Sequence, residues 1–329
     1  MPIAVWLMPA VWLLLLALLA FVVWRLHPTM SLNSPCCPPG SIGGCGKGGG
    51  SGGGKGEVIA LADGTRCYAV GPRRSAGAVV IVAHDIYGPA SGRTFGICDE
   101  LCERLGSEHG GALVLLPFLF DDAWPSERPM LGAWPKLRYL FGRALFRRWR
   151  QIEPAFRCAL LPLARRALGS SSSAESASSS SSARIALVGF CWGGWCNLRA
   201  CAAFPGAFCG AVGFHPSPQL CWLHGDALAP LVRRARATPV CFLPGWNDPG
   251  LVKEGGLVQR TLSEAEAAAP SGASVFRTFA RMAHGWVNRG DVAADARVRE
   301  DVRLAMDIAV GFLRERLSLP PAAASAARR

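Results

Sequence analysis

Residues 184–194 read RIALVGFCWGG, an apolar run that ends in small residues around one cysteine, Cys191. The apolar run predicts a buried strand, and the Gly-x-Cys-x-Gly-Gly pattern predicts a sharp turn into a helix with Cys191 at the apex. Glycine at 189 and 193 removes the Cβ atoms that would clash at so tight a turn. We therefore predict a nucleophile elbow, although a lone cysteine in such a turn is more often a small buried side chain.

The helix predicted after Cys191 suits a reactive sulfur. The free amides at the start of a helix carry a partial positive charge, which favours a thiolate over a thiol. The same amides can donate hydrogen bonds to an oxyanion that forms during attack on a carbonyl group. These properties favour a nucleophilic role for Cys191.

Strand and helix patterns alternate along the chain from residue 57 onwards. Short apolar or alternating runs predict strands at 57–61, 65–70, 78–83, 112–116, 184–188, 210–214, 238–243 and 274–279. Helical spacing separates most of them, and a last amphipathic helix has Val298, Val302, Ala305, Ala309 and Phe312 on one face. This alternation predicts an α/β fold with a mostly parallel sheet and helices on both faces.

The 329 residues are 50% hydrophobic, which is enough for a large core, and carry a formal net charge of +12. Residues 131–168 supply most of the excess charge, with nine Lys or Arg against one acid, Glu153. This basic helical insertion has two interpretations: a helix lying on anionic lipid, or a lid over the active site with solvated arginines. Nucleic-acid binding has less support because no recognition motif accompanies the charge.

Thirteen cysteines are scattered without the spacing of metal ligands. An odd number, with several inside predicted helices and strands, favours reduced thiols in an intracellular setting. Cys36, Cys37 and Cys45 could bind a metal or form a disulfide, but free thiols in a flexible leader are the preferred interpretation. We expect no metal site and no cofactor.

Residues 3–24 carry no charge and are long enough to cross a bilayer as a helix. We predict a membrane anchor over residues 1–30, with a cleaved signal or transit peptide and a soluble organellar or secreted domain as the alternative. The anchor is preferred because the basic region that opens a signal peptide is missing. Basic residues follow the span and no acid precedes Glu57, so the positive-inside rule predicts a cytosolic domain.

Composition divides the rest of the chain. Residues 31–56 are rich in Pro and Gly and predict a flexible linker, and residues 57–317 form the predicted catalytic domain. Within that domain, residues 170–182 are Ser-rich and too polar to pack, which predicts a disordered loop. Residues 318–329 are expected to be a flexible tail.

Two polar residues that follow predicted strands can complete the elbow. Asp248 follows the apolar run 240–243, and His284 follows the strand that ends near residue 280. Chemistry in a parallel sheet belongs beyond the carboxyl ends of its strands, and the order nucleophile, acid, histidine is that of α/β hydrolases. Singly, Asp248 would be a turn former and His284 a loop residue.

The motifs that carry these residues resemble those of a known family. The motif at 189–194, the Asp248 turn and His284-Gly285-Trp286 resemble the signatures of the dienelactone hydrolase family over about residues 57 to 317. Pro35-Cys36-Cys37-Pro38-Pro39 resembles the leader of the family's eukaryotic branch. The resemblance implies an α/β-hydrolase fold, a Cys-His-Asp triad and cofactor-free hydrolysis of a small ester or lactone.

The resemblance also implies a role for each matching residue. Cys191 is the nucleophile, His284 the base and then the acid, and Asp248 orients the imidazole. The backbone amides of Ile86 and Trp192 form the oxyanion hole. Thiolate attack gives a thioester, which water activated by His284 then hydrolyses.

Substrate contacts are expected from residues around these positions. In the family a glutamate at the position of Asp85 holds the resting thiol, and this side chain is one methylene shorter. Bacterial members bind a substrate carboxylate through an arginine where this chain has Asp121 and Asp122. The expected substrate-binding residues are Asp85, Tyr87, Trp286 and Arg281, with His215 as pocket lining. Arg281 and Arg289 flank His284 and can replace the lost cation, but solvated surface arginines are the preferred interpretation of each.

Two rival functions are considered. A catalytically silent relative would use the pocket and the basic helices for binding at a membrane, although an intact triad argues against it. A redox-responsive protein would need a thiol such as Cys196 to pair with Cys191. Two residues five apart on one helix are poorly placed for a disulfide.

Overall fold

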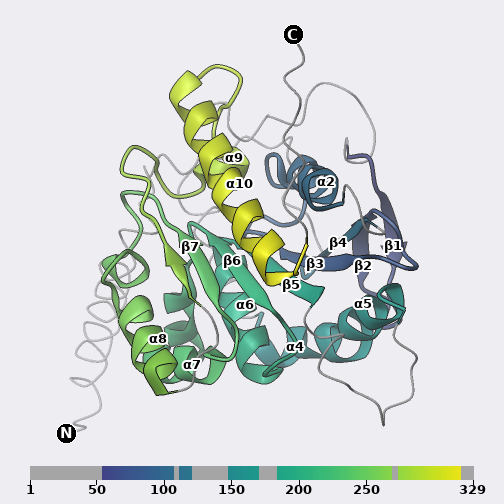
Figure 1. Cartoon of the computed structure of the whole chain (residues 1–329), viewed down its shortest axis with the longest axis horizontal. Coiled ribbons are helices and arrows are strands. Elements are labelled where there is room, and N and C mark those ends of the chain that lie inside the picture. Colours follow the sequence, from purple (N-terminus) through teal and green to yellow (C-terminus); the bar gives the residue numbers. More distant parts are fainter. Residues whose placement is uncertain (1–53, 107–110, 121–146, 170–183, 269–272, 320–329) are drawn as a thin grey trace, which may run out of the picture.

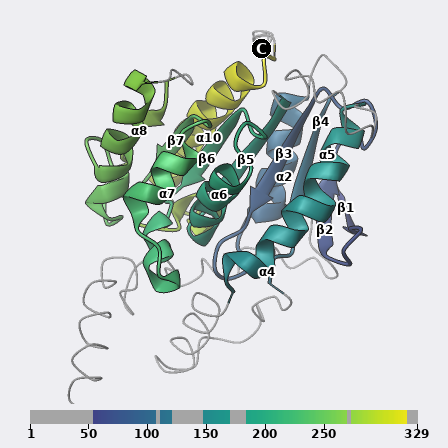
Figure 2. The same ribbon diagram turned by 90° about the horizontal axis from the view of Figure 1, so that it is seen from below.

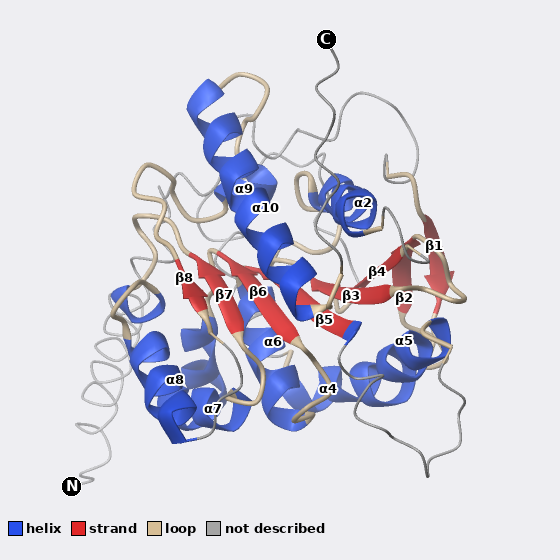
Figure 3. Ribbon diagram, in the orientation of Figure 1, coloured by secondary structure: helices blue, strands red, loops and turns tan. Residues whose placement is uncertain are grey.

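One sheet runs through the part of the chain described by the computed structural model, which is residues 54–106, 111–120, 147–169, 184–268 and 273–319. Its eight strands lie in the order β1-β2-β4-β3-β5-β6-β7-β8, parallel from β4 to β8, with β1 and β2 antiparallel at one edge (Figure 3). The strands are β1 (Glu57–Ala60), β2 (Arg66–Val70), β3 (Ala78–Ala83), β4 (Ala112–Pro117), β5 (Ile185–Phe190), β6 (Gly210–Phe214), β7 (Val240–Leu243) and β8 (Val275–Phe276). The predicted α/β fold with a mostly parallel sheet is confirmed.

Helices cover both faces of this sheet (Figures 1 and 2). One face carries α4 (Trp149–Pro154), α5 (Leu161–Ala167), α6 (Trp192–Ala203), α7 (Leu228–Ala235) and α8 (Leu257–Ala268). The other face carries α2 (Thr94–Leu105), α9 (Trp286–Arg289) and α10 (Ala296–Arg316). Two hydrophobic cores result, one on each side of the sheet.

Strand β3 shows how a continuous apolar run supplies both cores. Val79 and Ile81 face the α6 side, whereas Val80 and Val82 face the α10 side, and all four are completely buried. Successive side chains of a strand point to opposite faces, so a central strand covered on both sides must be apolar throughout. This is why β3 and its parallel neighbours β4 and β5 were recognisable in the sequence.

The basic insertion predicted over residues 131–168 is described from residue 147. There α4, a π-helical segment at Ala155–Leu160 and α5 follow one another directly. Pro154 ends α4 and Pro162 lies in the first turn of α5, and a proline removes a backbone donor and crowds the preceding turn, so the helix widens locally. Phe156 and Leu160 on its apolar face are completely buried against the sheet.

The described fold begins at the end of the predicted linker. The Lys55 amide donates to the Asp99 carboxylate on α2 at 2.9 Å, and the Gly56 amide donates to the Tyr68 hydroxyl at 2.6 Å. A Cβ at residue 56 would lie 2.4 Å from the Ala69 carbonyl oxygen, so only glycine fits there. These contacts place the start of the folded domain a few residues earlier than the composition indicated.

Several predicted segments lie outside the described residues. They are the anchor at 1–30, the linker as far as residue 53, the Ser-rich loop at 170–182 and the tail from residue 320. None of the helices within the described ranges has both the length and the apolar character needed to span a bilayer.

The elbow forms where β5 ends and α6 begins. Cys191 lies between them with φ +51°, a left-handed conformation that a residue with a Cβ seldom adopts. A Cβ at Gly193 would lie 2.1 Å from the carbonyl oxygen of Ala83 at the end of β3, and one at Gly189 would lie 2.5 Å from the Gly193 oxygen. The two glycines therefore let α6 pack directly against β3 and β5, as the sequence predicted.

We expect Gly193→Ala to destabilise the protein by about 1–3 kcal/mol, because the new methyl group must displace backbone atoms of β3. The measurement is the midpoint of urea unfolding. Gly311→Ala is the matched control, since Gly311 is exposed on α10 and a Cβ there meets nothing within 4 Å. Alanine in that open helical position should stabilise by about 0.5–1 kcal/mol. Equal midpoints for the two variants would contradict the packing argument.

Candidate active site

The sulfur of Cys191 is held in a defined place by the chain around it. The Cys191 amide donates to the Phe214 carbonyl of β6 at 3.2 Å, and the Cys191 carbonyl accepts from the amides of Gly194 and Ser217 at 2.9 and 3.0 Å. The Ser217 hydroxyl lies 3.8 Å from the sulfur and is placed to donate to it. Cys191 as a whole is only partly buried.

His284 and Asp248 form a buried hydrogen-bonded pair. The distance between His284 Nδ1 and Asp248 Oδ1 is 2.5 Å, and the second carboxylate oxygen accepts from the Gly245 amide at 2.6 Å. Both residues are about 3% exposed. A carboxylate bonded to Nδ1 fixes the tautomer of the ring and leaves Nε2 for the nucleophile.

The loops that carry these two residues are joined by several backbone contacts. The Trp246 amide donates to the Met282 carbonyl at 2.8 Å, and the His284 amide donates to the Asn247 side-chain oxygen at 2.6 Å. Farther along, the Glu254 carboxylate accepts from the Thr278 amide at 2.7 Å. The acid and the histidine therefore meet because the loops after β7 and β8 are held together along their length.

The pKa of His284 reflects two opposing effects. Burial by itself lowers the pKa, but the negative charges of Cys191 and Asp248 and their hydrogen bonds to the ring outweigh burial and raise the pKa to about 10. The ring is therefore a cation at neutral pH, with the Asp248 carboxylate and the Cys191 sulfur as its two partners.

The predicted oxyanion-hole amides flank the elbow. The Trp192 amide opens α6, and no acceptor for it exists among the described residues. Ile86 follows β3, the strand that pairs with β5, so its loop lies beside Cys191 at the same edge of the sheet. The oxyanion-hole role of the two amides stays a prediction.

Asp85 lies in the site but is bonded to groups other than the thiol. Its carboxylate accepts from the Tyr87 amide at 2.9 Å, the Ser91 hydroxyl at 2.7 Å and the Asn288 amide at 2.9 Å, and its distance to Arg289 Nε is 3.2 Å. The Arg289 guanidinium also lies over the Tyr87 ring, 4.2 Å from its centre. The shorter side chain therefore belongs to a buried polar cluster formed with the α9 segment.

Two predicted substrate-binding residues lie elsewhere. Arg281 is half-exposed and bonds the Asp301 carboxylate of α10 at 2.7 Å. The positive charge of Arg281 is therefore paired with an acid of α10. Trp286 is buried in the core on the α10 side, with its ring 4.6 Å from that of Phe279. The buried arginine of the site is Arg289, at the other end of α9.

The structure adds residues that sequence reasoning missed. Asn247 positions the His284 backbone, Ser217 contacts the sulfur, and Asn288 bonds Asp85. His215, expected as pocket lining, lies with its ring 4.8 Å from that of His284. Asn247 and Ser217 are close in sequence to Asp248 and His215, but no spacing rule identifies polar partners of this kind.

The other described thiols differ from Cys191. All ten cysteines in the described part of the chain are free, and burial raises the pKa of Cys201, Cys209 and Cys241 to about 12. Burial also raises the pKa of Cys196, which makes that thiol a poor partner for Cys191. Across the described ranges, no cluster of His, Cys, Asp or Glu side chains is arranged to hold a metal ion.

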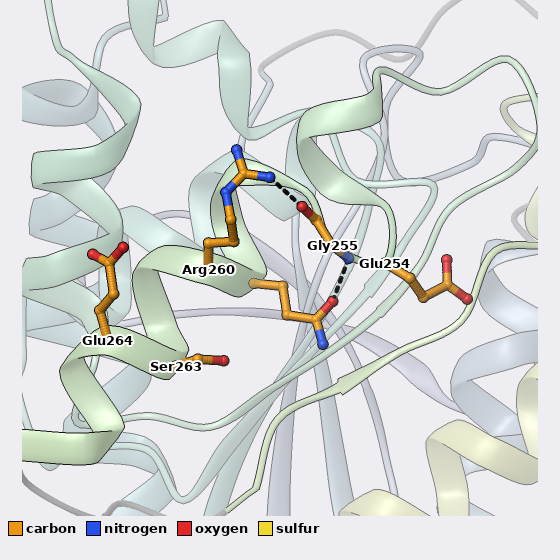
Figure 4. A pocket seen from close by; sticks show the side chains of 6 residues that line it. Glu254, Gly255, Arg260, Ser263 and Glu264 are labelled. Atoms are coloured by element: carbon orange, nitrogen blue, oxygen red, sulfur yellow. Dashed lines mark hydrogen bonds between the residues drawn. The ribbon is translucent and has the colours of Figure 1, made fainter.

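A hollow of about 520 Å³ on the surface of α8 involves none of these site residues (Figure 4). Within it, the Gly255 amide donates to the Gln259 side chain at 2.7 Å, and Arg260 donates to the Gly255 carbonyl. The side chains of Gln259 and Arg260 are thus both bonded to the backbone of Gly255. The hollow is lined by Glu254, Gly255, Gln259, Arg260, Ser263 and Glu264.

Comparison with solved structures finds similar folds at low identity. A protein provisionally called a dienelactone hydrolase from Klebsiella pneumoniae subsp. pneumoniae is 17% identical, with 78% of this chain and 95% of that chain covered and a TM-score of 0.49. A dienelactone hydrolase from Anabaena variabilis is 16% identical, with 77% and 94% covered and a TM-score of 0.41. A search of curated proteins found no match.

A comparison with family models is decisive. The model of the dienelactone hydrolase family matches residues 65–308, which is well over half of the chain and includes the elbow, the Asp248 loop and the His284 loop. Membership supports a carboxylic ester or lactone hydrolase. The chain belongs to the dienelactone hydrolase family.

Proposed function

We propose that the protein hydrolyses a small ester or lactone through a Cys191 thioester, with His284 and Asp248 as its catalytic partners. The observation that carries the proposal is the buried Asp248–His284 hydrogen bond beside a strained, accessible cysteine. This arrangement also favours catalysis over a silent binding role. A histidine oriented by a buried carboxylate activates a neighbouring nucleophile, and binding alone does not require such a pair.

Acylation begins from the ion pair. The Cys191 thiolate attacks the carbonyl carbon, and the oxygen becomes an oxyanion that accepts from the amides of Trp192 and Ile86. The oxyanion then collapses, the C–O bond breaks, and the His284 imidazolium gives its proton to the leaving alkoxide. A thioester and a neutral imidazole remain.

Formation of the thioester prepares the second half of the reaction. Two of the effects that raise the pKa of His284 come from Cys191, and both disappear when its sulfur is acylated. The pKa of the ring therefore falls in the acyl-enzyme, so the neutral imidazole persists as a base for water. The attacking water loses a proton to His284, the C–S bond breaks, and the acid product leaves with the thiolate–imidazolium pair restored.

We also propose that residues 3–24 tether the hydrolase to a membrane, with the catalytic domain on the cytosolic side. The proposal rests on the uncharged length of this segment and on the basic residues that follow it.

Cys191→Ala should lower hydrolysis of p-nitrophenyl acetate by about a thousandfold or more, because no thioester can form. The measurement is kcat/KM, together with circular dichroism to verify folding. Cys158→Ala is the matched control: Cys158 is an exposed thiol far along the chain from the site, and its loss should leave the rate unchanged. Equal activity of the two variants would remove Cys191 from the mechanism.

The kcat/KM for an alkyl ester should fall as the pH rises past about 10. The raised pKa of His284 means that the proton for the leaving alkoxide is present below pH 10 and is lost above it. Asp248→Asn removes one of the charges that raise this pKa, so the falling limb should move to lower pH.

A p-nitrophenyl ester is the control substrate for this pH dependence. Its leaving group needs no proton, so the high-pH fall should be much smaller for it. An identical fall for both substrates would show that the limb reports something other than the acid function of His284.

Removal of residues 1–53 should release the protein from membranes and leave ester hydrolysis within about twofold, because the described fold begins at Gly54. The measurement compares activity in the pellet and the supernatant after ultracentrifugation of cell lysate. A truncated protein that stays in the pellet would exclude the N-terminal segment as the sole tether and direct attention to the basic helix at 149–167.

A further inference from the structure

His215 is a second histidine in the site, and the proposed mechanism gives it no role. It directly follows β6, is completely buried, and has φ +39°, in the left-handed region. Its amide donates to the Leu243 carbonyl at 3.0 Å, which fixes the backbone beside the elbow. The ring packs against that of His284, with the ring centres 4.8 Å apart and the planes at 66°.

The hydrogen bonding of this ring is incomplete. Asn288 contributes a side-chain hydrogen bond to His215, but within the described part of the chain its geometry is too poor to satisfy either ring nitrogen or the Asn288 side-chain oxygen. The Asn288 side chain lies next to the His215 ring, and its nitrogen is already bonded to Asp85 at 2.9 Å. Each buried polar group left without a partner costs about 1–3 kcal/mol, so a cluster of them indicates a missing polar ligand.

The charge state of His215 limits what that ligand can be. Burial first, and then the positive charges of His284 and Arg289, hold the pKa of His215 well below its ordinary value. The ring is therefore neutral and offers one donor and one acceptor. A small neutral molecule that both donates and accepts fits this set of groups.

We propose that His215 and Asn288 hold the water molecule that hydrolyses the Cys191 thioester. This inference rests on the proposed function. Water needs two to four polar partners when it is buried, and His215, Asn288 and His284 provide three. Water is also a reactant in the hydrolysis of every ester and lactone.

The step balances with these groups alone. The water oxygen bonds to the thioester carbon while its proton passes to Nε2 of His284, and the oxyanion then expels the Cys191 thiolate as the C–S bond breaks. His215 neither gains nor loses a proton, because its low pKa makes it a weaker base than His284. Its contribution is to orient the water, so its loss should slow deacylation and spare acylation.

The test follows both half-reactions with p-nitrophenyl acetate, whose good leaving group makes acylation faster than deacylation. Stopped-flow absorbance gives the burst rate for acylation and the later linear rate for deacylation. The burst amplitude gives the concentration of active sites. The linear rate is divided by this concentration, so partial misfolding of a variant does not distort it. Intact mass spectrometry measures the acetyl group retained by the enzyme.

His215→Phe should keep the burst rate within about twofold and slow the linear rate about 10–100-fold, with acetyl-enzyme accumulating. His215→Asn should recover most of the linear rate, because its amide can donate and accept and asparagine tolerates a positive φ. His224→Phe is the matched control: it makes the same change in a ring that stacks on Trp195, and both rates should be unchanged.

Two results would overturn the inference. If His215→Phe slowed the burst and the linear phase equally, the ring would only support the structure of the site, and unchanged rates would mean that it has no role. Absence of an acetyl group on Cys191 in every variant would instead overturn the proposed function itself, which makes the two failures distinguishable.

Discussion

The close approach of two backbones at the elbow is the constraint on which the site depends. Gly193 lies so near the Ala83 carbonyl that no other residue fits without displacement. This contact sets the start of α6 against the end of β3, which holds the partly buried Cys191 in its strained conformation. The two segments that meet there also carry the amides of Ile86 and Trp192, which are the proposed oxyanion hole.

Charge coupling is the second feature that organises the site. The pKa of His284 is raised by the sulfur and by Asp248 against the opposing effect of burial. In the proposed mechanism this coupling lets the ring serve as an acid while the thiolate is present and as a base once the sulfur is acylated. The neighbouring His215 stays neutral because burial, and then the positive charges of His284 and Arg289, lower its pKa.

Parts of the fold and the site could be predicted because they have local causes. The boundaries of β3 and β6 agree with the apolar runs at 78–83 and 210–214, since a strand buried on both faces must be apolar throughout. The partners of Arg281 and Trp286 could not be predicted, because helical and strand periodicity says nothing about which element packs above a loop. Asp301 of α10 lies close to Arg281 only in the folded chain.

The sequence by itself determined the α/β class, the elbow around Cys191 and the order of Cys191, Asp248 and His284 at strand ends, because each follows from local sterics, periodicity or chain order. Tertiary structure alone decided which polar groups meet. Asp85 bonds the Asn288 side chain instead of a thiol, and the His215 ring packs against that of His284. Such contacts join residues far apart in the chain, and they arise only when packing of the sheet and its helices brings their loops together.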